Sequence, residues 1–280
     1  MASESEVHEK IVKYYEKSLH GYEIVLGGSQ HFGFYPEGKG GIIEKKAQEL
    51  MQDLLAEKLQ LKESDLVLDA GCGQGVVSAY LAKKCGCRVR GITIVPHEVH
   101  KANALANRMG VGGKTAYSLM DYSKTSFKGA QFDAVYTMET LVHSPNPEKT
   151  LREFRRVLKP GGRLAMFEYS ISEDDGFSPW ELKMLSLVIR GSAMAGLKKM
   201  RHNSLRQMLR KRGFTHIKEE NITAHVVPSL GKLRALAWLP YLAIKALGLQ
   251  ARFVNETAAV ELYGPLKKGL IRYCVLTAEK

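Results

Sequence analysis

Nine residues constrain the fold of this chain more than any other stretch. Residues 67–75 read Val-Leu-Asp-Ala-Gly-Cys-Gly-Gln-Gly, with an acid at 69 and glycine at alternate positions from 71 to 75. The apolar run before the acid predicts a buried strand, and a helix is expected from about Val76 to Lys84. Glycines in such a turn let backbone N–H groups come close to a ligand. The dinucleotide fingerprint spaces its glycines differently, and no phosphate-binding lysine follows.

Strands and helices alternate along the rest of the chain. A Lys-Pro-Gly-Gly run at 159–162 ends one predicted helix, because proline cannot continue a helix and glycine turns the chain. The alternation predicts an α/β fold with a doubly wound parallel sheet, which binds ligands at the carboxyl ends of its strands. Later strands are expected at 87–94, before 120, and at 132–138, 163–169, 216–223 and 270–278, with helices at 97–109, 151–158 and 204–211.

The glycine turn resembles the first motif of class I methyltransferases, which use S-adenosylmethionine (SAM). The resemblance implies a Rossmann-like, mostly parallel seven-stranded sheet with the turn beneath the cofactor. Many of these enzymes end the second strand with a ribose-binding acid. Residues 91–96 instead read Gly-Ile-Thr-Ile-Val-Pro, similar to tocopherol and cyclopropane-forming methyltransferases, so Thr93 or the Ile94 backbone is the expected substitute. The implied SAM-binding residues are Asp69, Gly71, Gly73, Gly75, Thr93, Ile94, Asp121, Tyr122 and Glu139.

Four further segments resemble sterol 24-C-methyltransferases. They are residues 14–16 (Tyr-Tyr-Glu), 27–32 (Gly-Gly-Ser-Gln-His-Phe), 138–145 (Met-Glu-Thr-Leu-Val-His-Ser-Pro) and 167–169 (Phe-Glu-Tyr). The likeness spans about residues 10–170 and implies methylation of an alkene carbon in a bulky, apolar, isoprenoid or sterol-like substrate. Tocopherol-type and some alkaloid methyltransferases carry Glu-Ser-x-x-His at the same place. The alternative is therefore O- or N-methylation of a small aromatic or alkaloid-like natural product.

The predicted catalytic residues follow the fourth and fifth strands: Glu139, His143, Glu168 and Tyr169. Methylation of an alkene leaves a carbocation, so the site needs a dry pocket, a carboxylate or π face near the cation, and a base. Either Glu139 or His143 could be that base. His143 could equally be a helix-start histidine held by a backbone carbonyl, and Glu168 could pair with an arginine.

The N-terminal segment is expected to form a lid. A helix is predicted over 6–20, and the glycines around residues 27–28 and 36–41 make the aromatic segment 14–35 a mobile loop. The predicted substrate-binding residues are Tyr14, Tyr15, Tyr22, His31 and Phe32, since aromatic side chains suit an apolar substrate and a passing cation. The predicted division is a lid at 1–62, a SAM-binding core at 63–172, a lid insertion at 173–200, a core helix and strand at 201–224, a second lid insertion at 225–268, and a closing strand at 269–280.

Positive charge is concentrated in one region. Between Arg190 and Phe253 lie thirteen Lys or Arg and only two acids, Glu219 and Glu220, so this segment carries nearly all of the net +12. The leucines and aromatic residues between the charges favour a membrane surface over nucleic acid, and a solvated helix face would explain them equally well. The expected partners are a small apolar substrate and no nucleic acid, with a peripheral membrane contact and a homo-oligomer both possible.

Cysteine usage and the terminus predict a cytoplasmic location. Cys72, Cys85, Cys87 and Cys274 have no disulfide framework or zinc spacing, so reduced thiols and no metal are expected. The polar first residues do not resemble a secretory signal. Strand four is followed by Met-Glu-Thr-Leu rather than the Asn/Asp-Pro-Pro-Tyr of nucleic-acid amino methyltransferases. A non-catalytic SAM-binding scaffold is the remaining alternative, against which the acids at 69, 121, 139 and 168 argue.

Overall fold

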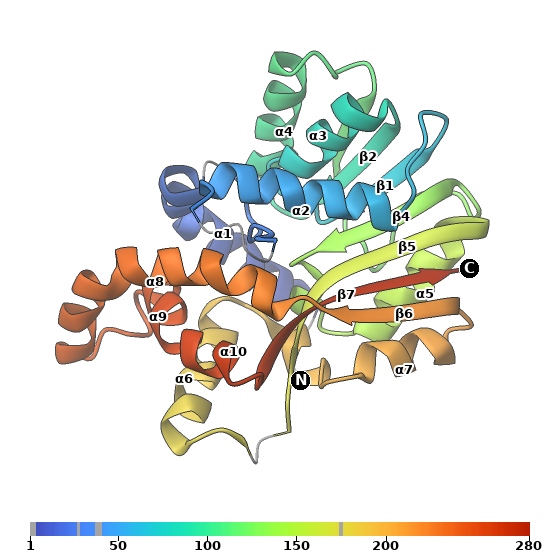
Figure 1. Cartoon of the computed structure of the whole chain (residues 1–280). Coiled ribbons are helices and arrows are strands. Elements are labelled where there is room, and N and C mark those ends of the chain that lie inside the picture. The colour runs from blue at the N-terminus through green and yellow to red at the C-terminus, as the bar shows by residue number, and fades with distance from the viewer. Residues whose placement is uncertain (1–3, 27–28, 37–40, 174–175) are drawn as a thin grey trace.

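A seven-stranded sheet forms the centre of the computed structural model (Figure 1). The model describes residues 4–26, 29–36, 41–173 and 176–280, with only the backbone for residues 4 and 20–26. The strand order is β3-β2-β1-β4-β5-β7-β6. The first five strands are parallel, and β7 runs antiparallel to both of its neighbours. The predicted doubly wound, mostly parallel sheet is therefore confirmed. The strands are β1 (Leu66–Ala70), β2 (Arg88–Thr93), β3 (Thr115–Leu119), β4 (Phe132–Met138), β5 (Leu158–Ile171), β6 (Thr215–Asn221) and β7 (Ile271–Glu279).

Strand register brings the motifs to one edge of the sheet. Asp69 of β1 pairs with Gly91 of β2 on one side and with Tyr136 of β4 on the other. The turns after these strands therefore start at the same level. Because the strands are parallel, their carboxyl ends meet at one edge, where ligands bind in this class of sheet.

Helices cover both faces of the sheet, and each face has its own apolar core. On one face lie α2 (Glu44–Lys58), α3 (Val76–Cys85) and α4 (Pro96–Arg108), which share a core with β1 and β2. On the other lie α5 (Pro147–Val157) and α7 (Ser204–Lys211). The helix α5 begins earlier than expected because the Asn146 side chain accepts a hydrogen bond from the Lys149 N–H and caps its first turn.

The two predicted insertions form one group of helices at the side of the sheet. These are α6 (Pro179–Gly191), the short η3 (Ala195–Lys199), α8 (Thr223–Ala246), α9 (Val254–Glu261) and α10 (Tyr263–Lys267). The helices α8, α9, α10 and α6 pack on one another (Figure 1). None of the described helices is both long enough and apolar enough to cross a membrane.

The N-terminal prediction needs correction. The chain forms one helix, α1 (Glu4–Leu26), so residues 14–26 are helical and not part of a mobile loop. Tertiary packing explains the difference: Val7 and Ile11 form a small core with Ala193, against which Tyr14 and Tyr15 pack. Residues 27–28, 37–40 and 174–175, on which other expected turns depend, lie outside the described residues.

The run at 159–162 also differs from expectation. It lies within β5, where the pairing with β4 shifts register between Phe132 and Ala134. The Pro-Gly-Gly sequence therefore makes an irregularity at the start of this strand as well as ending the helix before it.

Candidate functional site

One pocket lies at the carboxyl ends of β1, β2 and β4. It contains about 1000 Å³ of empty space, a volume that includes its open mouth. The turns after the first four strands line it, together with residues 29–31. The helix α1 contributes a further wall, with His8, Ile11 and Tyr15 on one helix face.

The glycine turn after β1 forms the floor of this pocket. Gly71 and Gly73 adopt φ values of +97° and +50°, which side-chain-bearing residues rarely adopt. A Cβ atom on Gly73 would overlap the Gln30 side chain. Gly75 is different, because it lies outside the pocket lining, and a Cβ there would come within 2.7 Å of the Ala102 Cβ. Packing against the following helices explains why a glycine is required at position 75, and the cofactor contact predicted for it stays a prediction.

Two buried carboxylates stand beside the turn. Asp69 accepts a hydrogen bond from the Ser78 hydroxyl, and burial raises the pKa of Asp69 to about 6. Glu98 projects from the first turn of α4 and accepts hydrogen bonds from Thr93 Oγ1 at 2.7 Å and from Gln30 Nε2 at 2.9 Å. Burial raises the pKa of Glu98 as well.

Glu98 and Gln30 are pocket residues that sequence reasoning missed. An acid was sought at the end of β2, where Thr93 and Ile94 stand, and both of these do line the pocket. The carboxylate comes instead from Glu98, five residues past Thr93, which is only 2% exposed. An acid in the first turn of the helix after that strand was the available signal. Its side chain can accept hydrogen bonds from vicinal hydroxyls such as those of a ribose.

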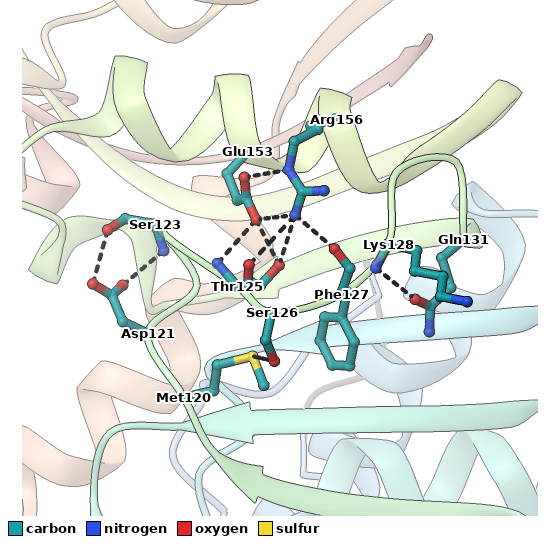
Figure 2. A network of polar contacts seen from close by, with 10 residues as sticks. All are labelled: Met120, Asp121, Ser123, Thr125, Ser126, Phe127, Lys128, Gln131, Glu153 and Arg156. Carbon is teal, nitrogen blue, oxygen red and sulfur yellow. Dashed lines mark hydrogen bonds and ion pairs between the residues drawn. The ribbon is translucent and has the colours of Figure 1, made fainter.

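Asp121 is held by its own loop. Its carboxylate accepts hydrogen bonds from the Ser123 N–H at 2.7 Å and the Ser123 hydroxyl at 2.8 Å (Figure 2). Further along the loop, Arg156 of α5 donates to the Phe127 carbonyl, and Glu153 accepts from the Thr125 N–H (Figure 2). These contacts fix the loop, so Asp121 is oriented before any ligand binds. His8 Nε2 lies 3.4 Å from the Asp121 carboxylate.

His143 and Tyr15 form a polar pair in the pocket wall. His143 Nδ1 lies 3.1 Å from the Ala193 carbonyl, and His143 Nε2 lies 2.9 Å from the Tyr15 hydroxyl. A carbonyl can only accept, so the hydrogen-bond network assigns the proton to Nδ1. The Nε2 lone pair then accepts from Tyr15. Burial lowers the pKa of His143 to about 4, so the ring is neutral at pH 7.

Glu139 is held by three donors. Its carboxylate accepts hydrogen bonds from the Phe32 N–H at 2.7 Å, from the Tyr273 hydroxyl at 3.0 Å and from the Tyr169 hydroxyl. Its backbone has φ +56°, a conformation that costs a non-glycine residue energy and often marks a functional position. Burial raises the pKa of Glu139 to about 7, although the three hydrogen bonds oppose the shift.

Two of the predicted catalytic residues stand behind the pocket instead of in its lining. Glu168 is fully buried, and its carboxylate accepts from the Thr140 and Leu141 N–H groups at the start of the short helix η1 (Leu141–His143). Burial raises its pKa to about 7. Tyr169 contacts Glu139 but does not line the pocket. Neither is placed to touch a ligand there, and the predicted pairing of Glu168 with an arginine is replaced by these backbone contacts.

The predicted substrate residues divide in the same way. Tyr15 and His31 line the pocket, whereas Tyr14 and Phe32 do not. The Tyr14 hydroxyl donates to Asn255 Oδ1 on α9, at 2.9 Å. His31 Nε2 lies 3.1 Å from Gln52 Nε2 in the core, and burial lowers its pKa to about 4. The side chain of Tyr22 lies outside the described residues. The predicted cofactor residues that do line the pocket are Asp69, Gly71, Gly73, Thr93, Ile94, Asp121, Tyr122 and Glu139.

The polar groups of the pocket fit SAM. Within the described parts of the chain, Ser29 Oγ and Gln74 Nε2 are buried without a hydrogen-bond partner, and both residues line the pocket. These donors suit the cofactor's carboxylate, because a buried donor left unpaired costs free energy. The acids Asp69, Glu98 and Asp121 supply acceptors for its ammonium, ribose and adenine groups.

Comparison with known proteins agrees with this geometry. A family model described as "Methyltransferase domain" matches residues 68–166. An S-adenosyl-L-methionine-dependent Diels-Alderase from Talaromyces variabilis is 32% identical, covering 99% of this chain and 97% of that protein. A sterol 24-C-methyltransferase from Eremothecium gossypii is also 32% identical, covering 62% of this chain and 48% of that protein. Among solved structures, a [4+2]-cyclase superposes with a TM-score of 0.77 at 25% identity, covering 98% of this chain and 96% of that one.

Proposed function

As a member of the class I SAM-dependent methyltransferases, this chain is, we propose, an enzyme that binds SAM and methylates a carbon atom of a bulky, apolar alkene. The fold and the SAM-dependent relatives imply the cofactor. When bound, SAM supplies an electrophilic methyl group. Methylation of an alkene carbon is proposed because residues of the pocket can accept the proton that must leave the substrate.

The cofactor is held from three sides in this proposal. The Gly71–Gly73 backbone, Asp69 and Gln74 form the floor, and Glu98 with Thr93 faces the ribose. Asp121 faces the adenine amino group, in the orientation that its loop fixes (Figure 2). Because these groups are already oriented, little conformational entropy is lost when the cofactor binds.

The Tyr15–His143 pair supports a proton-transfer role. The Tyr15 hydroxyl donates to His143 Nε2, so a substrate proton can pass to the tyrosine oxygen while the tyrosine proton moves to the histidine. The Ala193 carbonyl holds the opposite ring nitrogen and keeps Nε2 directed at Tyr15. We assign the base to His143 through Tyr15, and not to Glu139, whose carboxylate already accepts three hydrogen bonds.

The strength of this base favours carbon over oxygen. Burial lowers the pKa of His143 to about 4, whereas a phenol has a pKa of about 10. Removing a phenol proton would therefore be uphill by about 8 kcal/mol. A carbocation next to a C–H bond is a far stronger acid, so a weak, neutral base is sufficient. Glu139, whose charge lies near the same wall, would stabilise the positive charge as it develops.

A [4+2] cyclisation is the second candidate, because the likeness to the Diels-Alderase extends over almost the whole chain. Such a reaction rearranges electrons within one substrate and releases no proton. SAM would then bind without giving up its methyl group. O-methylation of a phenol is less well supported, since deprotonation of the phenol before methyl transfer needs a stronger base than His143. N-methylation of an alkaloid-like amine needs no base for the transfer and is distinguished by the atom that carries the new methyl group.

One experiment separates these functions. The protein is incubated with a cell lipid extract and trideuteromethyl SAM, and in parallel with S-adenosylhomocysteine, which has no methyl group to transfer. The proposal predicts a product that carries deuterium on a new carbon-bound methyl or methylene group, and no product with S-adenosylhomocysteine. A product of unchanged mass that forms with either cofactor would establish cyclisation. Deuterium on oxygen or nitrogen would overturn the assignment to carbon.

A further inference from the structure

The second half of α8 exposes apolar side chains on the side that faces away from the protein. Ala237, Tyr241 and Ile244 recur at helical spacing and are buried against the neighbouring helices. The remaining surface would normally be polar, but Leu236 is 64% exposed and Leu239 is 76% exposed. We define the α8 face by the large exposed apolar residues of this region: Leu236, Trp238, Leu239, Leu242, Leu247 and Phe253.

The charged residues of the segment that carries the α8 face are all of one sign, and an acid beside it is Glu261 of α9, 3.9 Å from Lys245 Nζ. No Asp or Glu occurs between residues 222 and 255, whereas Lys232, Arg234, Lys245 and Arg252 do. Several of these cations stack on aromatic rings. The Arg234 guanidinium lies 4.7 Å from the centre of the Trp238 ring. Lys245 Nζ lies 5.0 Å from the centre of the Trp180 ring, on α6 beside the face.

We propose that the α8 face docks on an anionic phospholipid bilayer. Leucine side chains would enter the outer part of the acyl region, and the tryptophans and cations would lie at the level of the head groups. Basic residues next to an apolar helix face gain affinity from anionic lipids. The buried stripe of Ala237, Tyr241 and Ile244 attaches α8 to the protein along its length, so the helix would lie in the plane of the surface.

The α8 face is close to the pocket wall. Two residues after Phe253, Asn255 of α9 accepts a hydrogen bond from Tyr14 and donates one to Ser18 Oγ at 3.0 Å. Both partners belong to α1, the helix that covers the pocket. An apolar compound dissolved in the bilayer would therefore be presented to the side of the protein where the pocket is covered.

Tryptophan fluorescence gives a direct test. The chain has two tryptophans, Trp180 and Trp238, and both lie in this region. The full-length protein is mixed with vesicles of equal parts phosphatidylcholine and phosphatidylserine, or of phosphatidylcholine alone. We expect a blue shift and co-sedimentation with the anionic vesicles, and quenching by lipids brominated on their acyl chains. The Trp180→Phe variant should retain the quenching, which assigns it to Trp238.

Substitutions distinguish docking of the α8 face on vesicles from nonspecific adsorption of the protein. Leu239→Glu should lower the partition onto anionic vesicles at least about tenfold. The substitution removes a leucine that the bilayer would bury and adds an anion that the anionic lipids repel. Leu119→Glu is the matched control, since Leu119 is 58% exposed at the end of β3 and lies outside the α8 face. It should bind vesicles like the unaltered protein. Circular dichroism and the unfolding midpoint confirm that both variants fold.

The cations have their own test. Lys245→Gln and Arg252→Gln should each weaken vesicle binding about fivefold, and salt should weaken binding of the unaltered protein. Absence of binding to anionic vesicles by the unaltered protein would overturn the proposal. So would equal loss of binding in Leu119→Glu and Leu239→Glu. A protein that is dimeric in sedimentation, and that Leu239→Glu makes monomeric without any vesicle binding, would show that the α8 face binds a second copy of the chain instead.

Discussion

Tyr14 and Tyr15 are neighbours in sequence but contact different parts of the molecule. The Tyr15 hydroxyl donates to His143 in the pocket wall, and the Tyr14 hydroxyl donates to Asn255 on α9. The two rings meet edge to face with centroids 5.1 Å apart. At the residue scale, this pair allows the effect of losing a hydroxyl to be distinguished from the effect of losing a packed ring. Each tyrosine can be changed to phenylalanine, which removes the hydroxyl and retains the ring.

Tyr15→Phe should reduce product formation about a hundredfold or more, because the proton path to His143 is broken. Its affinity for SAM, measured by calorimetry, should change little. Tyr14→Phe is the matched control and should retain most of the turnover. Equal turnover in Tyr15→Phe and the unaltered protein would exclude proton transfer through this pair, and would favour a reaction that releases no proton.

Gly73→Val should abolish measurable SAM binding. The residue has φ +50° and a Cβ there would overlap the Gln30 side chain, which also lines the pocket, so a branched side chain would strain the backbone and displace Gln30. Gly113→Val is the control, since Gly113 has open space around its Cα. Calorimetry on both folded variants checks the prediction, and normal SAM affinity in Gly73→Val would place the cofactor elsewhere.

Sequence reasoning located the pocket better than it located the groups in it. The glycine turn and Asp121 are adjacent to strand ends, so a local pattern is enough to place them. Glu98 was missed because its side chain reaches the pocket from a helix, and the sequence alone does not show which face of that helix is buried. The sequence also does not show that Glu168 is fully buried and accepts hydrogen bonds from the Thr140 and Leu141 N–H groups, because these contacts join residues distant in the chain.

At the scale of elements, the sheet was predicted nearly completely, whereas the N-terminal helix predicted over 6–20 continues to Leu26. Glycine and proline stand at the ends of most strands and helices, so the boundaries of these elements can be predicted from the sequence. The helix α1 continues through Gly21 and Tyr22, which have low intrinsic helix propensity. The contacts of α1 with Asn255, His143 and Ala193 are made by residues 7–15, and no local pattern of the sequence predicts them.

Removal of α1 should leave a folded protein that binds SAM more weakly and does not turn over. Deletion of residues 1–26 takes His8, Ile11 and Tyr15 from the pocket wall but keeps the floor. It also keeps Ser29 and His31, which are buried and belong with the core. Circular dichroism, SAM calorimetry and product analysis test this prediction.

The Asn255→Ala variant tests the same idea with less disturbance. It removes the side chain that holds both Tyr14 and Ser18, so α1 should detach more often and hydrogen exchange of its amides should become faster. Normal turnover by the protein that lacks residues 1–26 would show that α1 is not needed to close the site.

At the scale of the whole molecule, buried ionisable groups give stability a pH dependence. The pKa of Glu168 rises from 4.5 to about 7 on folding because the carboxyl is buried. Its contribution to stability is therefore complete below pH 4.5 and is lost as the pH rises through 7. The buried His143 has the opposite sign, since its pKa falls from 6.5 to about 4 and its contribution is lost as the pH falls through 4.

Glu168→Gln should reduce the loss of stability at high pH. Between pH 5 and pH 8 the unaltered protein should lose about 2 kcal/mol more unfolding free energy than the variant, because glutamine cannot ionise. Glutamine Oε1 can still accept from the Thr140 and Leu141 N–H groups. Urea unfolding at both pH values measures the difference. Glu57→Gln, at an exposed position of α2, is the control and should leave the pH dependence unchanged.

The two contacts that α1 makes with the pocket have a kinetic consequence. His8 lies beside Asp121, where the proposal places the adenine, and Tyr15 lies beside His143, two helical turns away on the same helix face. If α1 leaves the pocket as one body, both contacts break together, and spent cofactor and product share a single exit step. If that step is slower than the chemistry, rapid-quench measurements should show a burst of one product per enzyme, followed by a slower steady rate.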